Sequence, residues 1–355
     1  IRYININYPP KVQMLFLVSA DMPISLSFDF EIPGFIEEHL VDYPLPEMFD
    51  KYDINSNFVY NLWDFLATLL IILGIILGLV LLKMISKSFQ RTNRLITRVL
   101  DVLKWNIPVM MVCSSSGDLF FFAILQIRSA PLNTVSSIVC CVISLGMVFL
   151  VTAILFINLK ILRSYKKQGP DWKDKWKQYD ILYEEYEEKS AWSFSYMMLF
   201  VLGGVAFNLT LVSLFDYPLM QCIIINISNL FMFGYLLYWR PLKSFFVQVQ
   251  LFINEGLVFV LGVCILILAI LDKAGIRGQS TRTSVGEAIL FIIQTFNTFG
   301  LVFMGLEMLG FVIAIYKTWK RLRGQGIRSP IKMLKSLIFE DPGEEISPNS
   351  NVKTS

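Results

Sequence analysis

The sequence contains few charged residues and a single histidine. Lys, Arg, Asp and Glu make up 17% of its 355 residues, whereas hydrophobic residues make up 55%. Soluble domains carry about a quarter charged residues, so this composition excludes a soluble enzyme, a disordered tail and a nucleic-acid-binding protein. The net charge of +3 is small, and the distribution of charges along the chain is more informative than their sum.

Motifs for catalysis, cofactor binding and metal binding are also missing. One histidine, His39, cannot supply a Ser-His-Asp triad inside the predicted membrane region, and no glycine-rich phosphate loop or His/Cys cluster with metal-ligand spacing is found. All five cysteines lie within predicted spans, so the outer segments lack a disulfide. We therefore predict a protein that is not an enzyme and has no cofactor. His39 is expected to be a solvated loop residue, with a metal ligand as the lesser alternative.

Long apolar runs, in contrast, are abundant. A hydrocarbon core of about 30 Å needs about 20 apolar residues per helix, and seven stretches are long enough. These stretches are Phe58 to Leu82, Ile107 to Ile127, Thr134 to Leu159, Trp192 to Phe215, Pro218 to Trp239, Val249 to Leu271 and Val285 to Tyr316. They predict an all-α polytopic membrane protein with seven transmembrane helices. Prolines near the spans all lie at their ends, which predicts unbroken helices.

The Lys and Arg residues predict the orientation of the chain. Most of the 31 cations lie after the first, third, fifth and seventh spans, and few lie elsewhere. Cytoplasmic loops carry an excess of Lys and Arg, so the N-terminus is predicted outside and the C-terminus in the cytosol. Beyond the spans, residues 324–355 are predicted to form a cytosolic amphipathic helix, Pro330 to Phe339, and a disordered tail.

The residues before the first span show the alternation of β-strands. Polar and apolar residues alternate from Tyr3 to Tyr8 and from Ile24 to Phe30, and prolines bound both stretches. Two or three strands cannot bury a core alone, so residues 1–57 are expected to be an extracytoplasmic, membrane-proximal β segment that ends a larger ectodomain. The start at Ile1, without Met or a signal peptide, favours the same interpretation.

Five cations recur just after the first span, within a predicted cytosolic helix over 83–104. They are Lys83, Lys87, Arg91, Arg94 and Arg98. Their spacings of 4, 4, 3 and 4 place them on one helical face. Voltage-sensor arginines lie within the apolar span, whereas these lie beyond it. We predict that this basic stripe lies at anionic lipid headgroups, and the alternative is a charge pattern that only sets the orientation.

Aromatic residues form a second pattern, in the connection between the third and fourth spans. They are Trp172, Trp176, Tyr179, Tyr183 and Tyr186, which we call the aromatic seam. Their spacings of 4, 3, 4 and 3 predict a helix over 171–190 with one aromatic face. We expect this face to be buried on the inner membrane surface or on a partner, and the acidic end, Glu184 to Glu188, to meet the basic stripe. The alternative is a solvated helix that caps the bundle.

Polar residues inside the spans are functional candidates, because burying an ionisable group in lipid is costly. The candidates are Asp118, Asn208, Asn226, Asn229, Asn254, Glu255 and Glu307. Asp118 lies near the middle of the second span and is expected to face another helix, paired with a polar side chain or an ion. Asp118, Glu255 and Glu307 are candidates for a cation site. Interhelical hydrogen bonding is the alternative and the commoner role of such residues.

One stretch of sequence resembles a known family. Tyr238 to Leu242 reads Tyr-Trp-Arg-Pro-Leu, and with Phe252 to Glu255 it is similar to the linker and fifth helix of TRP/polycystin-like membrane regions, in particular the multi-span C-terminal region of giant ciliate surface proteins. This resemblance covers most of residues 58–323 and implies that spans two to seven form a six-helix TRP-like core. It further implies a plasma or ciliary membrane location, an upstream ectodomain, and other membrane or surface subunits in a hetero-oligomeric complex.

The connection between the sixth and seventh spans departs from that family. Asp272 to Ser284 comprises 13 residues, too few at about 1.5 Å per residue for a helix that enters the membrane and a filter that returns. The short connection therefore favours a TRP-like fold without a conducting filter. We expect a membrane anchor and assembly module of a larger cell-surface protein of the receptor or adhesion type, and the alternative is a cation-channel subunit.

Overall fold

The computed structural model describes residues 3–4, 6–20, 30–52, 54–85, 93, 96–97, 99–100, 102–168, 172–276 and 279–324. These residues form helices and contain no β-strand. The chain divides into two compact units, Ile1–Ile293 and Gln294–Ser355. The basic stripe beyond Lys83, the predicted helix Pro330 to Phe339 and the predicted tail lie outside the described residues.

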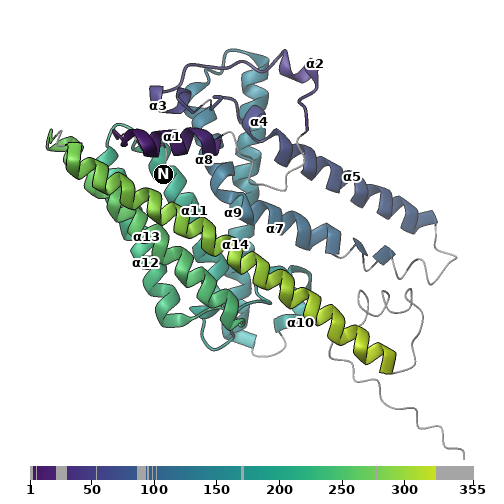
Figure 1. Ribbon diagram of the computed structural model, residues 1–355. Helices are drawn as coiled ribbons and strands as arrows, with labels where there is room; N and C mark the ends of the chain where they lie inside the picture. The colour runs from purple at the N-terminus through teal and green to yellow at the C-terminus, as the bar shows by residue number, and fades with distance from the viewer. Residues whose placement is uncertain are drawn as a thin grey trace, which may run out of the picture. The chain divides into compact units, whose positions relative to one another are not determined.

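Helices long and apolar enough to cross a membrane dominate both units (Figure 1). They are α5 (Trp63–Ile85), α9 (Val135–Gln168), α11 (Tyr196–Ser213), α12 (Pro218–Trp239), α13 (Phe245–Lys273) and α14 (Gln279–Gly324). A bent pair, α7 (Ile107–Ser114) and α8 (Ser116–Ser129), makes a seventh span if it is counted as one. The predicted all-α class is thus confirmed, and six or seven helices are long and apolar enough to span a membrane.

The second predicted span is broken, so the prediction of unbroken helices was wrong. The helices before and after Ser115 meet at an angle of 62°. The hydroxyls of Ser114 and Ser116 donate to the carbonyls of Met111 and Cys113, at 2.9 and 2.8 Å. Serine side chains that bond to the backbone in this way bend helices, and glycine at position 117 weakens the helix further. The run of three serines and a glycine, rather than a proline, causes the break.

Elements of the first unit gather at two ends. At one end, described residues from Tyr3 to Phe16 and from Leu40 to Ile54 pack with the end of α8, the turn between α11 and α12 and the start of α14. The N-terminal segment includes α1 (Pro10–Ala20), α2 (Gly34–Glu37) and α3 (Glu47–Asp50), and α4 (Phe58–Asn61) follows it. The opposite end holds residues 172–195 and the turn between α12 and α13. The predicted outer connections and the predicted inner connections therefore lie at different ends.

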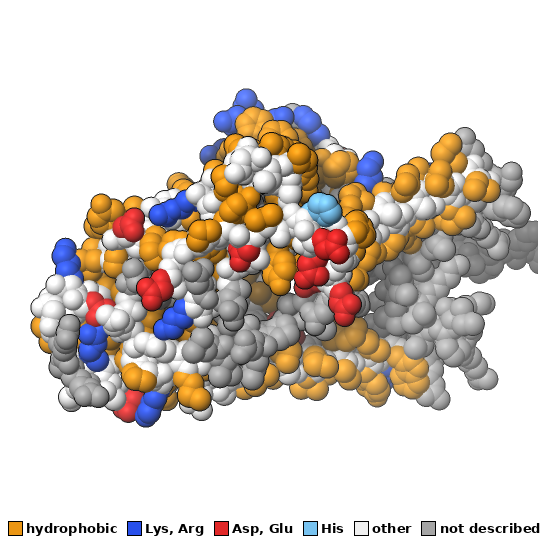
Figure 2. Space-filling view, turned by 90° about the horizontal axis from the view of Figure 1, so that it is seen from above, with side chains coloured by type: hydrophobic (Ala, Val, Ile, Leu, Met, Phe, Trp, Pro, Cys, Tyr) orange, Lys and Arg blue, Asp and Glu red, His pale blue; other side chains and the backbone are white. Residues whose placement is uncertain are grey.

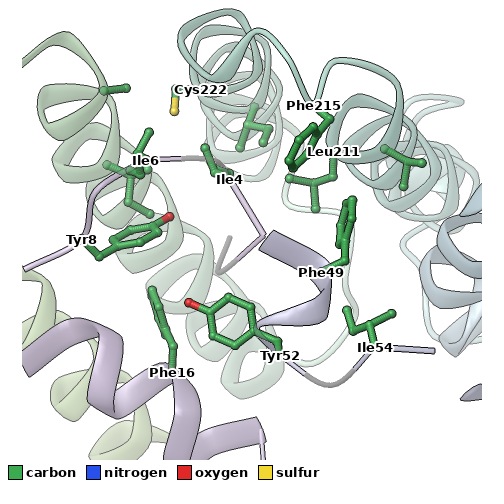
Figure 3. Close-up of a cluster of buried hydrophobic side chains, with 14 of the residues drawn as sticks. Ile4, Ile6, Tyr8, Phe16, Phe49, Tyr52, Ile54, Leu211, Phe215 and Cys222 are labelled. Atoms are coloured by element: carbon green, nitrogen blue, oxygen red, sulfur yellow. The ribbon is translucent and has the colours of Figure 1, made fainter. Parts of the chain in front are cut away.

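The predicted β-strand from Tyr3 to Tyr8 was wrong, although its alternation is meaningful. Ile4, Ile6 and Tyr8 are buried, but they insert between the helix ends rather than into a sheet (Figure 3). The backbone N–H groups of Ile6 and Tyr8 donate to the carbonyls two residues earlier. These bonds form tight turns and take the place of hydrogen bonds to a neighbouring strand. Most of the second predicted strand, Ile24 to Phe30, lies outside the described residues.

The predicted continuous helix over 171–190 was also wrong. The described part of this stretch forms α10 (Trp172–Trp176) and the 3-10 helix η4 (Lys177–Leu182), with non-helical backbone angles at Tyr179. The residues that follow form backbone hydrogen bonds with the turn after α12. The amide of Glu187 donates to the carbonyl of Pro241, at 2.7 Å, and the amide of Lys243 donates to the carbonyl of Glu185, at 3.0 Å. These tertiary hydrogen bonds replace the helical ones.

Candidate intramembrane polar pocket

A pocket of about 280 Å³ lies among five helices of the first unit, beside the bend between α7 and α8. Its polar lining comes from Ser114 and Ser116 at the bend, Ser228 and Asn229 on α12, and Glu255 on α13. Its apolar lining includes Phe200, Gly203, Gly204 and Phe207 on α11, Met232 on α12 and Val258 on α13. The pocket thus brings together two of the predicted intramembrane residues, Asn229 and Glu255.

Close packing of α8 on α11 forms one wall of this pocket. A Cβ atom added at Gly117 would lie only 2.6 Å from Nδ2 of Asn208, and one added at Gly204 would lie 3.9 Å from the Cα atom of Gly117. Asn208 donates from Nδ2 to the carbonyl of Gly204, at 3.0 Å. Small residues that allow helix backbones to approach in this way are typical of membrane helix pairs. Asn208 therefore has a packing role beside the pocket.

A second asparagine, Asn226, joins α12 to α13. Its Nδ2 atom donates to the carbonyls of Cys222 and Gly262, at 2.8 and 3.0 Å. A Cβ atom at Gly262 would lie 2.7 Å from Oδ1 of Asn226, so a larger residue there would displace the Asn226 side chain. Interhelical hydrogen bonding, one of the two roles considered for these residues, is what the structure shows for Asn226.

Glu255 differs from these two asparagines, because its side chain makes no polar contact comparable to those of Asn208 and Asn226. The carboxylate of Glu255 is partly buried and forms no hydrogen bond or ion pair with the described residues. Nδ2 of Asn229 is buried and has no partner among them either. Unsatisfied polar groups are costly in a low-dielectric interior, and native structures contain few of them. Glu255 is thus the ionisable group of the pocket that has no partner and is available to a ligand.

The other predicted acidic residues do not line this pocket. Asp118 lies in the first turn of α8, is exposed and forms no hydrogen bond with the described residues, and its pairing with a polar side chain or an ion stays a prediction. Asn254 is partly buried on α13, and Glu307 is exposed on α14 in the second unit.

No metal centre is found in the described part of the chain. There, no three His, Cys, Asp or Glu side chains are close enough to hold a metal ion. His39 is exposed, and its Nδ1 lies 3.0 Å from the carbonyl of Phe35. Figure 2 shows red acidic side chains near this pale blue histidine; Glu37, Glu38 and Asp42 are exposed in the same segment.

The aromatic seam packs against its own chain. Trp172, Tyr179, Tyr183 and Tyr186 are buried, and Trp176 is partly buried. The rings of Trp172 and Tyr183 lie 4.7 Å apart, edge to face. Burial, and to a lesser extent the nearby carboxylates of Asp180 and Glu184, raises the pKa of Tyr183 to about 12. The first predicted cation of the basic stripe, Lys83, lies in the last turn of α5.

Sequence reasoning missed several features of the pocket. Ser228 and the pair Gly203-Gly204 were not among the predicted residues, and the bend at Ser115 was not expected. Two signals were present: three consecutive serines within an apolar span, and adjacent glycines in another.

No protein-family model matches the chain, and neither a curated protein nor a solved structure matches it significantly.

Proposed function

We propose that the chain is a non-enzymatic membrane anchor and assembly module of a larger cell-surface protein. The observation that carries this proposal is the packing of the N-terminal segment into the helix ends. Ile4, Phe49 and Phe215 belong to one cluster with residues from α8, α12, α13 and α14 (Figure 3). A segment so buried would hold any domain linked to it in a defined position relative to the membrane helices.

Polar contacts strengthen this attachment. The amide of Asn7 donates to the carboxylate of Asp272, at 2.7 Å, and its carbonyl accepts from Arg282, at 3.2 Å. Asp272 and Arg282 also form an ion pair, and their side chains are only 18% and 17% exposed. Nearby, a Cβ atom at Gly286 would lie 2.8 Å from the ring of Pro9. We call this set of contacts the N-terminal clamp, and it ties the extramembrane segment to α13 and α14.

The short connection from α13 to α14 supports a fold without a filter. Helix α13 ends at Lys273 and α14 begins at Gln279. The five residues between them are too few for a re-entrant helix and a returning filter, since a helix rises only about 1.5 Å per residue. A pore-forming loop within this chain is therefore disfavoured.

Exposed apolar helices support the assembly role. Only 17% of the most apolar part of α5 and 6% of that of α14 is buried within the chain. Lipid can cover such surfaces, but α14 also carries the exposed carboxylate of Glu307, which is costly in hydrocarbon. A neighbouring subunit in the plasma membrane would supply a polar partner for it. Membrane lipids, the upstream ectodomain and other membrane or surface subunits are the partners that we propose.

A cation-channel subunit is the second candidate, and Glu307 is the observation that favours it. Several copies of α14 around an axis would place a ring of carboxylates along a shared pathway, and such rings select cations. A membrane anchor and assembly module, in contrast, must bind other subunits but need not conduct ions.

Membrane reconstitution distinguishes the two functions. For an anchor and assembly module, the purified full chain should migrate as an oligomer on native gels and remain in carbonate-washed membranes. It should also carry no cation current in planar bilayers. On intact cells, an N-terminal tag should be reached by antibody, whereas a tag after Ser355 should need permeabilisation. Reproducible cation currents that Glu307→Gln abolishes would establish the channel instead.

A further inference from the structure

We propose that the intramembrane pocket binds a small ligand with a primary ammonium group on a short apolar body. The site lies on Glu255, Asn229 and the bend between α7 and α8. It needs neither the ectodomain nor an oligomer, so it stands apart from the anchor proposal.

The polar half of the pocket has an excess of acceptors. Ser114 and Ser116 donate their hydroxyl protons to backbone carbonyls, so toward a ligand they offer lone pairs. The carboxylate of Glu255 and Oδ1 of Asn229 add further acceptors. A ligand with several N–H donors and a positive charge matches this set, because it compensates the only ionisable group in the lining.

The apolar half of the pocket lining favours an organic cation over an inorganic one. Phe200, Phe207, Met232 and Val258 line the remaining wall of a volume of about 280 Å³. A lone metal ion would leave most of this volume to water, and each water needs two to four polar partners, which this wall does not offer. An apolar body fills the space instead, and aromatic rings within about 6 Å of an ammonium group attract it further.

Gly203 provides a way to fill the pocket without disturbing the helices. It lines the pocket, and a Cβ atom added there meets nothing within 4 Å. Gly146, on α9, also has open space around a Cβ atom and does not line the pocket. Gly203→Leu and Gly146→Leu therefore form a matched pair: both add the same side chain to a membrane helix, but only the first occupies the proposed site.

Calorimetric titration of the purified full chain in lipid nanodiscs tests the proposal, with phenethylamine as the probe and 2-phenylethanol as its neutral isostere. We expect saturable phenethylamine binding that weakens at least about tenfold in Glu255→Gln, which removes a charged hydrogen bond, and in Gly203→Leu. Gly146→Leu and Glu307→Gln should bind as the wild type does. Circular dichroism and gel filtration check that each variant is folded.

Four results would overturn the proposal. They are no saturable phenethylamine binding, equal affinity for 2-phenylethanol, unchanged affinity in both pocket variants, and displacement of the amine by sodium chloride but not by choline chloride. The last result would identify an inorganic cation site. None of these results depends on oligomerisation or membrane anchoring, so failure of this inference is distinct from failure of the proposed function.

Discussion

The N-terminal cluster and the intramembrane pocket lie in the same unit but are packed in opposite ways. In the cluster, large side chains such as Phe49 and Ile4 are fully buried, and the clamp satisfies the backbone of Asn7. In the pocket, glycines replace large side chains, and polar atoms of Asn229 and Glu255 lack partners. Dense apolar packing stabilises a fold, whereas an open polar lining leaves interaction energy available to a ligand.

Removal of a large side chain from the cluster should have the largest effect. Phe49 is fully buried, so Phe49→Ala is expected to destabilise the protein by about 3–5 kcal/mol, through lost burial and the cavity left behind. Unfolding by sodium dodecyl sulfate in mixed micelles measures this loss. Phe35 in the same segment is 73% exposed, and Phe35→Ala should change stability by less than about 0.5 kcal/mol. Equal effects would show that the cluster is not a core.

Overpacking at the wall of the pocket should have the next largest effect. Gly117→Ala places a Cβ atom 2.6 Å from Nδ2 of Asn208, so a loss of about 1–3 kcal/mol is expected in the same unfolding measurement. Adding Asn208→Ala removes the obstructing side chain and should recover part of this loss. Gly146→Ala, in open space, is the control. A double variant less stable than Gly117→Ala alone would contradict this account of the contact.

The clamp should contribute less. Asp272→Asn weakens both the ion pair with Arg282 and the hydrogen bond from Asn7, and because these groups are partly exposed we expect a loss of about 1 kcal/mol. Amide hydrogen exchange over residues 6–20 should become faster. The exposed pair of Lys11 and Glu287, 3.8 Å apart, is the matched control, and Lys11→Gln should leave exchange unchanged. Unchanged exchange in Asp272→Asn would show that apolar packing alone holds the segment.

The substitution Tyr183→Phe, at the opposite end of the unit, is expected to have the smallest effect on stability at neutral pH. Burial raises the pKa of Tyr183 in the folded state from 10 to about 12, so the folded state favours the neutral phenol. This contribution to stability is fully present below pH 10 and is lost as the pH rises toward 12. Tyr183→Phe should therefore match the wild type at pH 7 and lose less stability than the wild type above pH 10. Tyr217, which is 64% exposed, provides the control variant Tyr217→Phe.

Some features of both regions could be predicted from the sequence. Hydrophobic length alone predicted the long apolar helices, because every helix that crosses lipid must satisfy its backbone internally and present apolar side chains. The alternation from Tyr3 to Tyr8 correctly indicated alternate burial, but a period of two does not specify whether the partner is a sheet or a set of helix ends. Likewise, the aromatic seam is largely buried, but backbone hydrogen bonds to residues 241–243 replaced the predicted helix.

The sequence by itself determined the helical class, the approximate positions of the long apolar helices and the absence of catalytic motifs, because these depend on composition and local periodicity. Only the tertiary structure decided that α7 and α8 meet at 62°, that Asn226 bonds across to α13, and that Glu255 faces a pocket while Asp118 is exposed. These features depend on which residues from distant parts of the chain come into contact. A polar residue in a span has no role until its neighbours are known, since the same carboxylate is paired, exposed or open to a ligand according to the helices around it.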